Sequence, residues 1–319
     1  MYNGLINVYK EPGFTSMDVV AVLRGILKQK KIGHTGTLDP QAEGVLMVCL
    51  GNATKLCTFL EDKDKEYVCR MLLGTTTDTE DTTGKVLSQK DASGISEEDI
   101  TKAIKSFVGD YAQVPQMYSA LKKDGKKLYE LARQGIEIER EARPIKIYDI
   151  EIIGIELPYV TFRVKCSKGT YVRSLCRDIG EKLGVGACMD HLTRTSVSFF
   201  TIYNALKLSD IERLAKEEKI EELILETSEV FKDKKALYVL PEFTKYIDNG
   251  NPLQKEYVRL ENSEIQDNEN NLNEQNDSDN PWNINNQNLF RVYNTSGQFV
   301  AVYSYDESRE IYMPVKMFI

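Results

Sequence analysis

The hydrophobic pattern of the N-terminal part predicts one helix followed by one buried strand. Thr15-Ser-Met-Asp18 is typical of a capping box, and apolar residues then recur at three- and four-residue intervals up to Gln29, as on one face of a helix. The continuous apolar run Val45-Leu-Met-Val-Cys-Leu50 lies between Gly44 and Gly51. A run so short and so bounded favours a buried strand, although its periodicity alone also fits a buried helical turn.

Short strands and helices then alternate along the chain. The pattern predicts strands at residues 66–73, 145–155 and 159–166 and helices at residues 52–60, 100–108 and 171–183. Ser96-Glu-Glu-Asp99 is a second capping box, Asn52 is a candidate helix cap, and residues 209–212 are predicted to cap a further helix. Adjacent strand pairs between separated helices favour an α/β fold with a mixed sheet over a strict βαβ repeat.

The C-terminal part has a different composition. Residues 261–288 are dominated by Asn, Asp, Glu and Gln, and we expect a disordered insertion there because so few side chains are large and apolar. The flanking segments, residues 236–260 and 290–319, are interpreted as the two halves of one small β-rich domain. The predicted organisation is therefore a main domain at 1–235 and a small domain at 236–319.

Composition limits the class of protein. The longest apolar stretch has six residues, far below the roughly 18 needed to span a membrane, and the N-terminus lacks a secretory pattern. We therefore expect a cytoplasmic protein with no membrane partner. The six cysteines are scattered among apolar residues without a CxxC pair, which is typical of buried thiols. With only two histidines, the chain shows no zinc-ligand spacing, and no metal is predicted.

Charge is unevenly distributed along the chain. The formal net charge is -8, which by itself argues against a polyanionic partner. Residues 101–200, however, contain 17 Lys and Arg against 12 Asp and Glu, whereas residues 201–319 contain 13 against 22. A local basic surface, and not the overall charge, determines phosphate binding. Binding of RNA by the central part is therefore compatible with the acidic total.

The sharpest local feature is the octapeptide Gly33-His-Thr-Gly-Thr-Leu-Asp-Pro40, in which two glycines and a proline surround one carboxylate. The proline biases Asp39 toward an extended backbone, and on its own the segment also fits an ordinary Asp-Pro turn. It resembles the catalytic loop of the TruB pseudouridine synthases. Five further blocks resemble that family in the same order: Lys10-Glu-Pro-Gly-Phe-Thr-Ser16, Lys65-Glu-Tyr67, Gly74-Thr-Thr-Thr-Asp-Thr-Glu-Asp81, Tyr118-Ser-Ala-Leu-Lys122 and Ser167-Lys-Gly-Thr-Tyr-Val-Arg173.

The resemblance implies the pseudouridine synthase fold, in which helices flank a mixed, largely antiparallel central sheet. It also implies an enzyme that isomerises uridine 55 in the T-arm of tRNA. That reaction cleaves the bond from C1′ to N1, turns the uracil and rejoins it through C5, so no redox step and no cofactor are implied. Asp39 would be the catalytic carboxylate, acting as a nucleophile or as a base toward the sugar.

Positions within the matching blocks imply further site residues. Arg173 corresponds to the arginine that pairs with the catalytic aspartate, and we expect it to lower the aspartate's pKa. Tyr67 corresponds to the tyrosine on which the flipped base stacks, and Tyr171 and Leu192 to positions of the base pocket. His34 corresponds to a histidine that contacts the RNA near the flipped nucleotide. Taken without the resemblance, each of these residues also fits an ordinary packing or surface role.

The segment from residue 116 to residue 146 is rich in positive charge, with eight Lys and Arg against five acidic residues. It resembles the RNA-gripping insertion of the family, which implies that Lys122, Lys123, Lys126, Lys127 and Arg133 bind tRNA. Residues 126–133 are predicted to form a charge-rich helix, a pattern that equally fits a solvated face. Two C-terminal segments, residues 250–253 and 313–318, weakly resemble the RNA-binding tail domain of some bacterial members.

The sequence is compatible with three functions. The first is a stand-alone enzyme acting on tRNA as a monomer, without a guide RNA. The second is a non-catalytic RNA-binding or tRNA-folding protein on the same scaffold, and the third is a guide-dependent relative inside a ribonucleoprotein. The presence of Asp39, Tyr67 and Arg173 favours the first over the second, and the bacterial character of the blocks favours it over the third.

Overall fold

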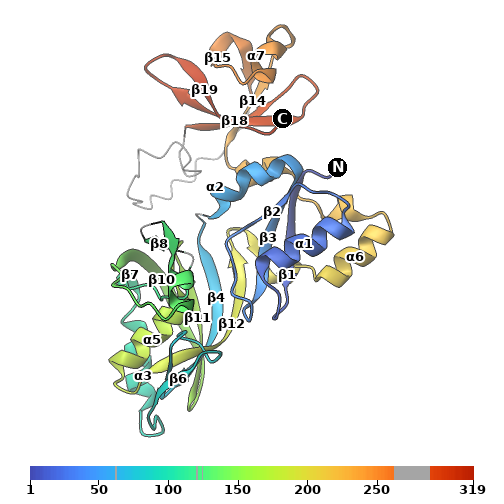
Figure 1. The fold of residues 1–319 in the computed structure, drawn as a ribbon. Helices are drawn as coiled ribbons and strands as arrows, with labels where there is room; N and C mark the ends of the chain where they lie inside the picture. The colour runs from blue at the N-terminus through green and yellow to red at the C-terminus, as the bar shows by residue number, and fades with distance from the viewer. Residues whose placement is uncertain (62, 120, 124, 262–287) are drawn as a thin grey trace.

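A computed structural model describes residues 1–61, 63–119, 121–123, 125–261 and 288–319. A large mixed sheet forms the main domain, and a smaller sheet forms the C-terminal domain that stands above it in Figure 1. The main sheet has the strand order β1-β3-β12-β4-β11-β10-β7. Along this path β12 pairs with β3 in parallel and the other pairs are antiparallel. The predicted fold class is thus confirmed.

The elements of the main domain have the following bounds. Its sheet contains β1 (Gly4–Lys10), β2 (Ile32–Thr35), β3 (Glu43–Leu50), β4 (Lys65–Leu73), β7 (Gly109–Gln113), β10 (Arg143–Glu156), β11 (Tyr159–Cys166), β12 (Ala187–Val197) and β13 (Phe200–Thr201). Two small hairpins are β5 (Thr75–Thr77) with β6 (Val86–Gln89), and β8 (Lys122–Lys123) with β9 (Lys126–Lys127). The helices are α1 (Ser16–Ile26), α2 (Cys57–Glu61), α3 (Glu97–Lys105), α4 (Leu128–Arg133), α5 (Val172–Lys182) and α6 (Leu208–Lys216), with 3-10 turns η1 (Gly51–Leu56), η2 (Ile202–Asn204), η3 (Ile220–Leu223) and η4 (Thr227–Phe231).

Both faces of the β1 and β3 half of the sheet are covered. On one face, Val19, Val20 and Leu23 of α1 and Ile211 of α6 pack against the strands. On the other face, α2, η4 and part of the C-terminal domain form a second core with the strands. This double covering explains why the apolar run predicted as a buried strand is buried along its whole length, from residue 45 to residue 50.

The other half of the sheet is packed by α3 and α5, which lie together at the lower left of Figure 1. Alternate residues of β4 and β11 point into this core, and their burial patterns alternate accordingly. The helix α5 begins directly after the loop that joins it to β11. It packs against β12 and β4, two strands near the middle of the sheet.

The C-terminal domain is one six-stranded sheet built from both sides of the gap in the described chain. It contains β14 (Lys235–Val239), β15 (Leu253–Gln254), β16 (Val258–Leu260), β17 (Leu289–Tyr293), β18 (Phe299–Asp306) and β19 (Ile311–Met317), with α7 (Thr244–Asp248), η5 (Pro241–Phe243) and η6 (Lys255–Tyr257). The expected β-rich domain is confirmed. The disorder predicted for residues 261–288 concerns a segment that lies almost entirely outside the described residues.

An aromatic cluster joins the C-terminal domain to the main domain. The ring of Phe231 in η4 lies 6.3 Å from Phe59 of α2 and 6.1 Å from Phe299 of β18, and 6.4 Å from Phe318 near the C-terminus. All these distances are in the range of favourable ring contacts. The two domains therefore share a hydrophobic core.

Several predicted boundaries are corrected by the structure. The first helix ends at Ile26 instead of Gln29, and the last predicted helix of the main domain starts at Leu208, so residues 209–212 lie inside it. Asn52 lies within η1 and does not cap it. Residues 126–133 are not one helix, because the first two form β9 and α4 starts at Leu128. Residues 126 and 127 pair with β8 instead of joining the helix, so strand pairing outcompetes helical propensity there, and the other differences lie at the ends of elements.

The capping boxes and the cysteines have the environments that the sequence predicts. Both capping boxes lie at helix starts: Thr15 and Ser96 are the N-caps of α1 and α3 and accept hydrogen bonds from Asp18 N and Asp99 N. Five of the six cysteine thiols are buried, as predicted. In the described part of the chain, no helix is long and apolar enough to cross a membrane.

Candidate active site

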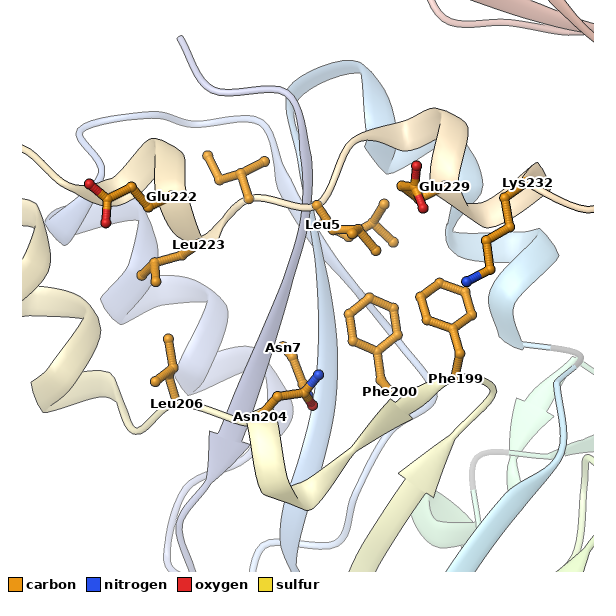
Figure 2. Close-up of a pocket in the computed structure, with 12 residues that line it drawn as sticks. Leu5, Asn7, Phe199, Phe200, Asn204, Leu206, Glu222, Leu223, Glu229 and Lys232 are labelled. Carbon is orange, nitrogen blue, oxygen red and sulfur yellow. The ribbon is translucent and has the colours of Figure 1, made fainter. Parts of the chain in front are cut away.

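Two cavities of similar size differ in their chemistry. One, of about 490 Å³, lies beside β1, and Figure 2 shows Phe199 and Phe200 side by side in its wall, near Leu5. The other, of about 430 Å³, is lined by Asp39, Tyr67 and Arg173, with other residues of the catalytic-loop and helix segments. Perturbed ionisable groups that converge in a cleft indicate a functional site. The second cavity is therefore the candidate active site.

The loop that carries Asp39 connects β2 to β3 and is shaped by its own sequence. Gly36 has a φ of 69°, in the left-handed region that favours glycine. Ser16, the first residue of α1, accepts a hydrogen bond from Leu38 N at 3.0 Å. A helix-terminal hydroxyl thereby fixes the backbone immediately before the aspartate.

Lys10 holds the other side of this loop. Its side chain is fully buried, and its ammonium donates to Pro40 O at 3.0 Å, to Ala42 O and to Glu11 O. Burial lowers the pKa of Lys10 to about 8, against the opposing effect of the negative charge of Asp39. Lys10, in the block of residues 10–16, therefore fixes the backbone of the residues that follow Asp39. The sequence alone does not reveal this role.

Arg173 pairs with Asp39, as predicted. Its Nη2 donates to Asp39 Oδ1 at 2.7 Å, and its Nη1 donates to Asp81 Oδ2 at 3.2 Å. Two backbone carbonyls, Thr79 O at 3.3 Å and Tyr118 O at 3.4 Å, accept further hydrogen bonds from the same guanidinium. The fork of one arginine is thus fixed between two carboxylates. Asp81 was not singled out from the sequence, although it lies in one of the matching blocks.

The pKa of Asp39 is raised overall, although Arg173 lowers it as expected. Burial raises the pKa of Asp39, the positive charge of Arg173 lowers it, and the neighbouring Asp81 raises it again, and the net direction is upward. Burial is the largest of these effects and outweighs the charge of Arg173, which also pairs with Asp81. The Asp39 side chain remains 37 % exposed at the cavity, so solvent moderates these effects.

Tyr67 lies on β4 with Arg194 of β12 directly opposite, so both side chains project from the same face of the sheet. Tyr67 is 9 % exposed and lines the cavity. Burial raises the pKa of Tyr67, while the positive charge of the neighbouring Arg194 acts in the opposite direction. Arg194 is 1 % exposed and also lines the cavity, yet no sequence signal singled it out.

Tyr171 and Leu192 also line the cavity. Tyr171 is the residue before α5, and Gln113 fixes its backbone by donating to Tyr171 O at 3.0 Å and accepting from Tyr171 N at 2.8 Å. Leu192 lies on β12 and is 6 % exposed. The structure therefore brings five predicted residues, Asp39, Tyr67, Tyr171, Arg173 and Leu192, around one cavity.

His34 lies apart from this group. It is part of β2, opposite Val48 of β3, and it is not among the residues that line the cavity. Burial, together with the positive charge of Arg194, lowers the pKa of His34 and favours the neutral ring. Its Nδ1 is buried and, within the described part of the chain, has no hydrogen-bond partner.

The lysines of the central basic segment lie on a small hairpin. In the β8 and β9 hairpin, Lys122 pairs with Lys127 and Lys123 with Lys126. Arg133 of α4 and Lys127 both lie over the ring of Tyr129, at 5.3 and 5.4 Å from its centroid. Like charges directly opposite each other destabilise a strand pair. Four lysines concentrated in this way suit a surface that meets a polyanion.

In the residues that the structure describes, no three His, Cys, Asp or Glu side chains are grouped so that they could hold a metal ion. The functional groups that line the cavity are a carboxylate held by a guanidinium, with a tyrosine and a second guanidinium beside it. This set can act on a sugar carbon and can bind a planar base.

Comparison with known proteins identifies the relatives of this chain. Residues 24–172 match the N-terminal domain of the TruB family of pseudouridylate synthases, and residues 173–232 match the C-terminal domain of tRNA pseudouridylate synthase B. The tRNA pseudouridine synthase B of Lachnoclostridium phytofermentans is 48 % identical over 99 % of this chain and 100 % of the relative. That of Clostridium tetani is 50 % identical over 78 % of this chain and 84 % of the relative.

Solved structures give a more distant likeness. A chain from a Cbf5-Nop10-Gar1 complex has 27 % sequence identity and a TM-score of 0.69, over 99 % of this chain and 85 % of that chain. A chain from an H/ACA ribonucleoprotein bound to a substrate RNA containing 2′-deoxyuridine has 25 % identity and a TM-score of 0.68, with the same coverage.

Proposed function

The chain belongs to the TruB family of pseudouridylate synthases and is a tRNA pseudouridine synthase, an isomerase, and from this premise we propose that it acts on uridine 55 of the T-arm with Asp39 as its catalytic carboxylate. The observation that carries the proposal is the ion pair of 2.7 Å between Asp39 and Arg173 in the wall of a cavity large enough for a nucleotide base.

The chemistry follows from the position of the carboxylate. Breaking the C1′–N1 bond requires help at the sugar, and an ionised Asp39 provides it either by attacking C1′ or by removing a sugar proton. Arg173 keeps the carboxylate oriented and opposes the upward pull of burial on its pKa. After the uracil turns, C5 bonds to C1′, and the proton on C5 is then replaced by a proton on N1.

The target base has to leave its stack to reach this carboxylate. Tyr67 offers an aromatic face in the cavity, with Leu192 and Tyr171 as further walls. Stacking on an aromatic side chain contributes about 1–3 kcal/mol per base, which offsets much of the cost of extrusion. His34, outside the cavity but on the adjoining strand β2, is proposed to contact the RNA beside the flipped nucleotide.

We further propose that the hairpin of Lys122, Lys123, Lys126 and Lys127, together with Arg133, grips the tRNA backbone. Four of these five side chains are exposed and Lys127 is partly buried. Phosphates would relieve the repulsion between the paired lysines. The affinity for tRNA should therefore fall as salt rises.

The protein is proposed to act alone, in the cytoplasm, as a monomer and without a guide RNA. The curated relatives at 44–50 % identity are tRNA pseudouridine synthases B, whereas the likeness to the ribonucleoprotein chains is 25–27 %. A non-catalytic tRNA-folding protein on this scaffold would not need an aspartate held by an arginine in the cavity.

The test uses purified protein and a T-arm-containing tRNA transcript without any other RNA. Pseudouridine should form at position 55, and a transcript with cytidine at that position should give none. Asp39→Asn should lose at least about 10³-fold in single-turnover rate, as for removal of a covalent or acid–base catalyst, while its tRNA affinity stays within a few-fold. Asp248→Asn, an exposed change on α7, is the control. Normal turnover by Asp39→Asn, or product elsewhere in the tRNA, would refute the assignment.

A further inference from the structure

Arg194 is a buried cation that the reaction described above does not use. It is fully buried in the wall of the candidate active site. Its Nε donates to Val45 O at 2.7 Å and its Nη2 to Gly36 O at 3.0 Å. Within the part of the chain that the structure describes, no carboxylate lies within ion-pair distance of it, in contrast to Arg173. A buried charge without a counter-ion destabilises the folded protein, so its presence calls for a functional explanation.

Arg194 occupies the base-binding side of the cavity. It is the direct cross-strand neighbour of Tyr67, and Leu192 lies two residues earlier on the same face of β12. The positive charge of its guanidinium lowers the pKa of the neighbouring Tyr67 hydroxyl, against the stronger effect of burial. The cavity thus has one guanidinium paired with the carboxylate that acts on the sugar and a second, unpaired one beside the face on which the base would stack.

The reaction creates a charge on the base that the ground state lacks. When the C1′–N1 bond breaks, its electron pair goes to the ring, and the detached uracil is an anion with its charge spread over N1, O2 and O4. The charge disappears again when C5 bonds to C1′, and the proton that C5 then loses to a base is balanced by a proton gained at N1. A fixed positive group beside the ring would stabilise this intermediate and the transition states around it more than the neutral substrate, which is what raises kcat.

We propose that Arg194 is a catalytic residue whose guanidinium stabilises the uracil anion after the C1′–N1 bond is cleaved, an inference that rests on the proposed function of this cavity. Two of its five N–H groups donate to the carbonyls of Val45 and Gly36. The remaining N–H groups are available to the carbonyl oxygens of a base.

A purely structural role would have different consequences. As a latch, Arg194 ties the loop of Asp39 to β12 through Gly36 O, and a neutral amide of similar length could donate to the same carbonyls without a buried charge. A latch would position Asp39, so its loss would slow the reaction to the same extent for every leaving group. An anion-stabilising charge would matter less when the leaving base is more acidic.

The test compares two leaving groups in full-length tRNA. The target uridine is either unmodified or replaced by 5-fluorouridine, whose base is more acidic than uracil and leaves with less assistance. Wild type, Arg194→Lys and Arg194→Gln are compared in single-turnover loss of the N-linked nucleoside, with Arg213→Gln, an exposed residue of α6, as the matched control. Thermal melting and tRNA affinity are measured for each variant.

Arg194→Gln should lose about 10²- to 10³-fold on uridine, as expected for removal of one preorganised donor to a developing anion. On 5-fluorouridine its loss should be at least about tenfold smaller, and Arg194→Lys, which keeps the charge, should lose less than Arg194→Gln on both. Equal losses on the two substrates, or a loss confined to tRNA affinity, overturn the proposal. If Arg194→Gln does not fold, Arg194→Lys is compared with wild type on the two substrates. A loss that is smaller on 5-fluorouridine than on uridine supports the proposal, and equal losses overturn it. Absence of pseudouridine formation by wild type would instead refute the proposed function.

Discussion

The replacement of Arg173 by lysine tests how the carboxylate is held. Arg173 joins Asp39 and Asp81 through different nitrogens and also donates to two backbone carbonyls at 3.3 and 3.4 Å. Lysine has one ammonium on a flexible stem and can reach only one of the two carboxylates at a time. The substitution keeps a positive charge and removes the fork.

The magnitude follows from the bonds that are lost. One hydrogen bond to a charged group contributes about 1.5–3 kcal/mol, and the Asp39 end belongs at the low side of that range because this carboxylate is 37 % exposed and screened by solvent. The two long carbonyl bonds add about 0.5 kcal/mol each. A loss of about 2–4 kcal/mol on the transition state corresponds to a rate lower by roughly 30- to 1,000-fold.

The pH dependence of the reaction rate tests the role of Arg173 independently. The reaction needs ionised Asp39, so the rate is present above the pKa of Asp39 and is lost as pH falls through it. Burial has already raised that pKa, and Arg173 is the largest opposing influence. Because lysine interacts less well with Asp39 than arginine does, Arg173→Lys should raise the pKa of Asp39 further. The acid limb of its pH–rate profile should therefore lie at higher pH than that of wild type.

The assay is single-turnover release of the C5 hydrogen from labelled tRNA across the pH range, with thermal melting measured in parallel. Arg177→Lys is the control, because Arg177 lies one turn later on α5 and pairs with Glu80 and Asp178 outside the cavity. The control should lose stability while its rate stays near wild type. A rate for Arg173→Lys within threefold of wild type, with an unshifted acid limb, would refute the reasoning.

Three further outcomes are expected. Replacing the four lysines of β8 and β9 by glutamine should weaken tRNA binding and lower the slope of log affinity against log salt by about 3, measured by filter binding, and an unchanged slope would remove these lysines from the interface. Gly44→Ala should destabilise the protein by several kcal/mol (order of magnitude), because the added Cβ would lie 2.3 Å from Arg194 O at a φ of +102°. Gly13→Ala is the control: its φ is +89°, the space around it is open, and it should cost only about 1 kcal/mol. Equal melting temperatures of the two variants would contradict this expectation. Tyr67→Phe keeps the stacking face but loses the hydroxyl near Arg194, so tRNA affinity should be retained, and strong inactivation in single turnover would assign a role to that hydroxyl.

Some features of this protein could be predicted because they depend on local sequence. The capping boxes at Thr15 and Ser96, the buried strand at residues 45–50 and the β-rich C-terminal part follow from spacing and composition, which act over a few residues. Resemblance to the family then identified Asp39, Tyr67 and Arg173 as residues that belong together, and the structure places them around one cavity.

Other features were decided by the tertiary structure, because they depend on segments far apart in the chain. Arg194 reaches the site because β12 pairs with β4, and Asp81 reaches it because the chain turns back after β5. Neither arrangement is visible in the local sequence. The same applies to the direction of the Asp39 pKa, which is set by burial and by the neighbouring charges of Arg173 and Asp81. Sequence thus determined which chemistry the chain carries, while long-range packing determined which groups surround it, because the strength of a charge depends on burial and on neighbours that only the folded chain brings together.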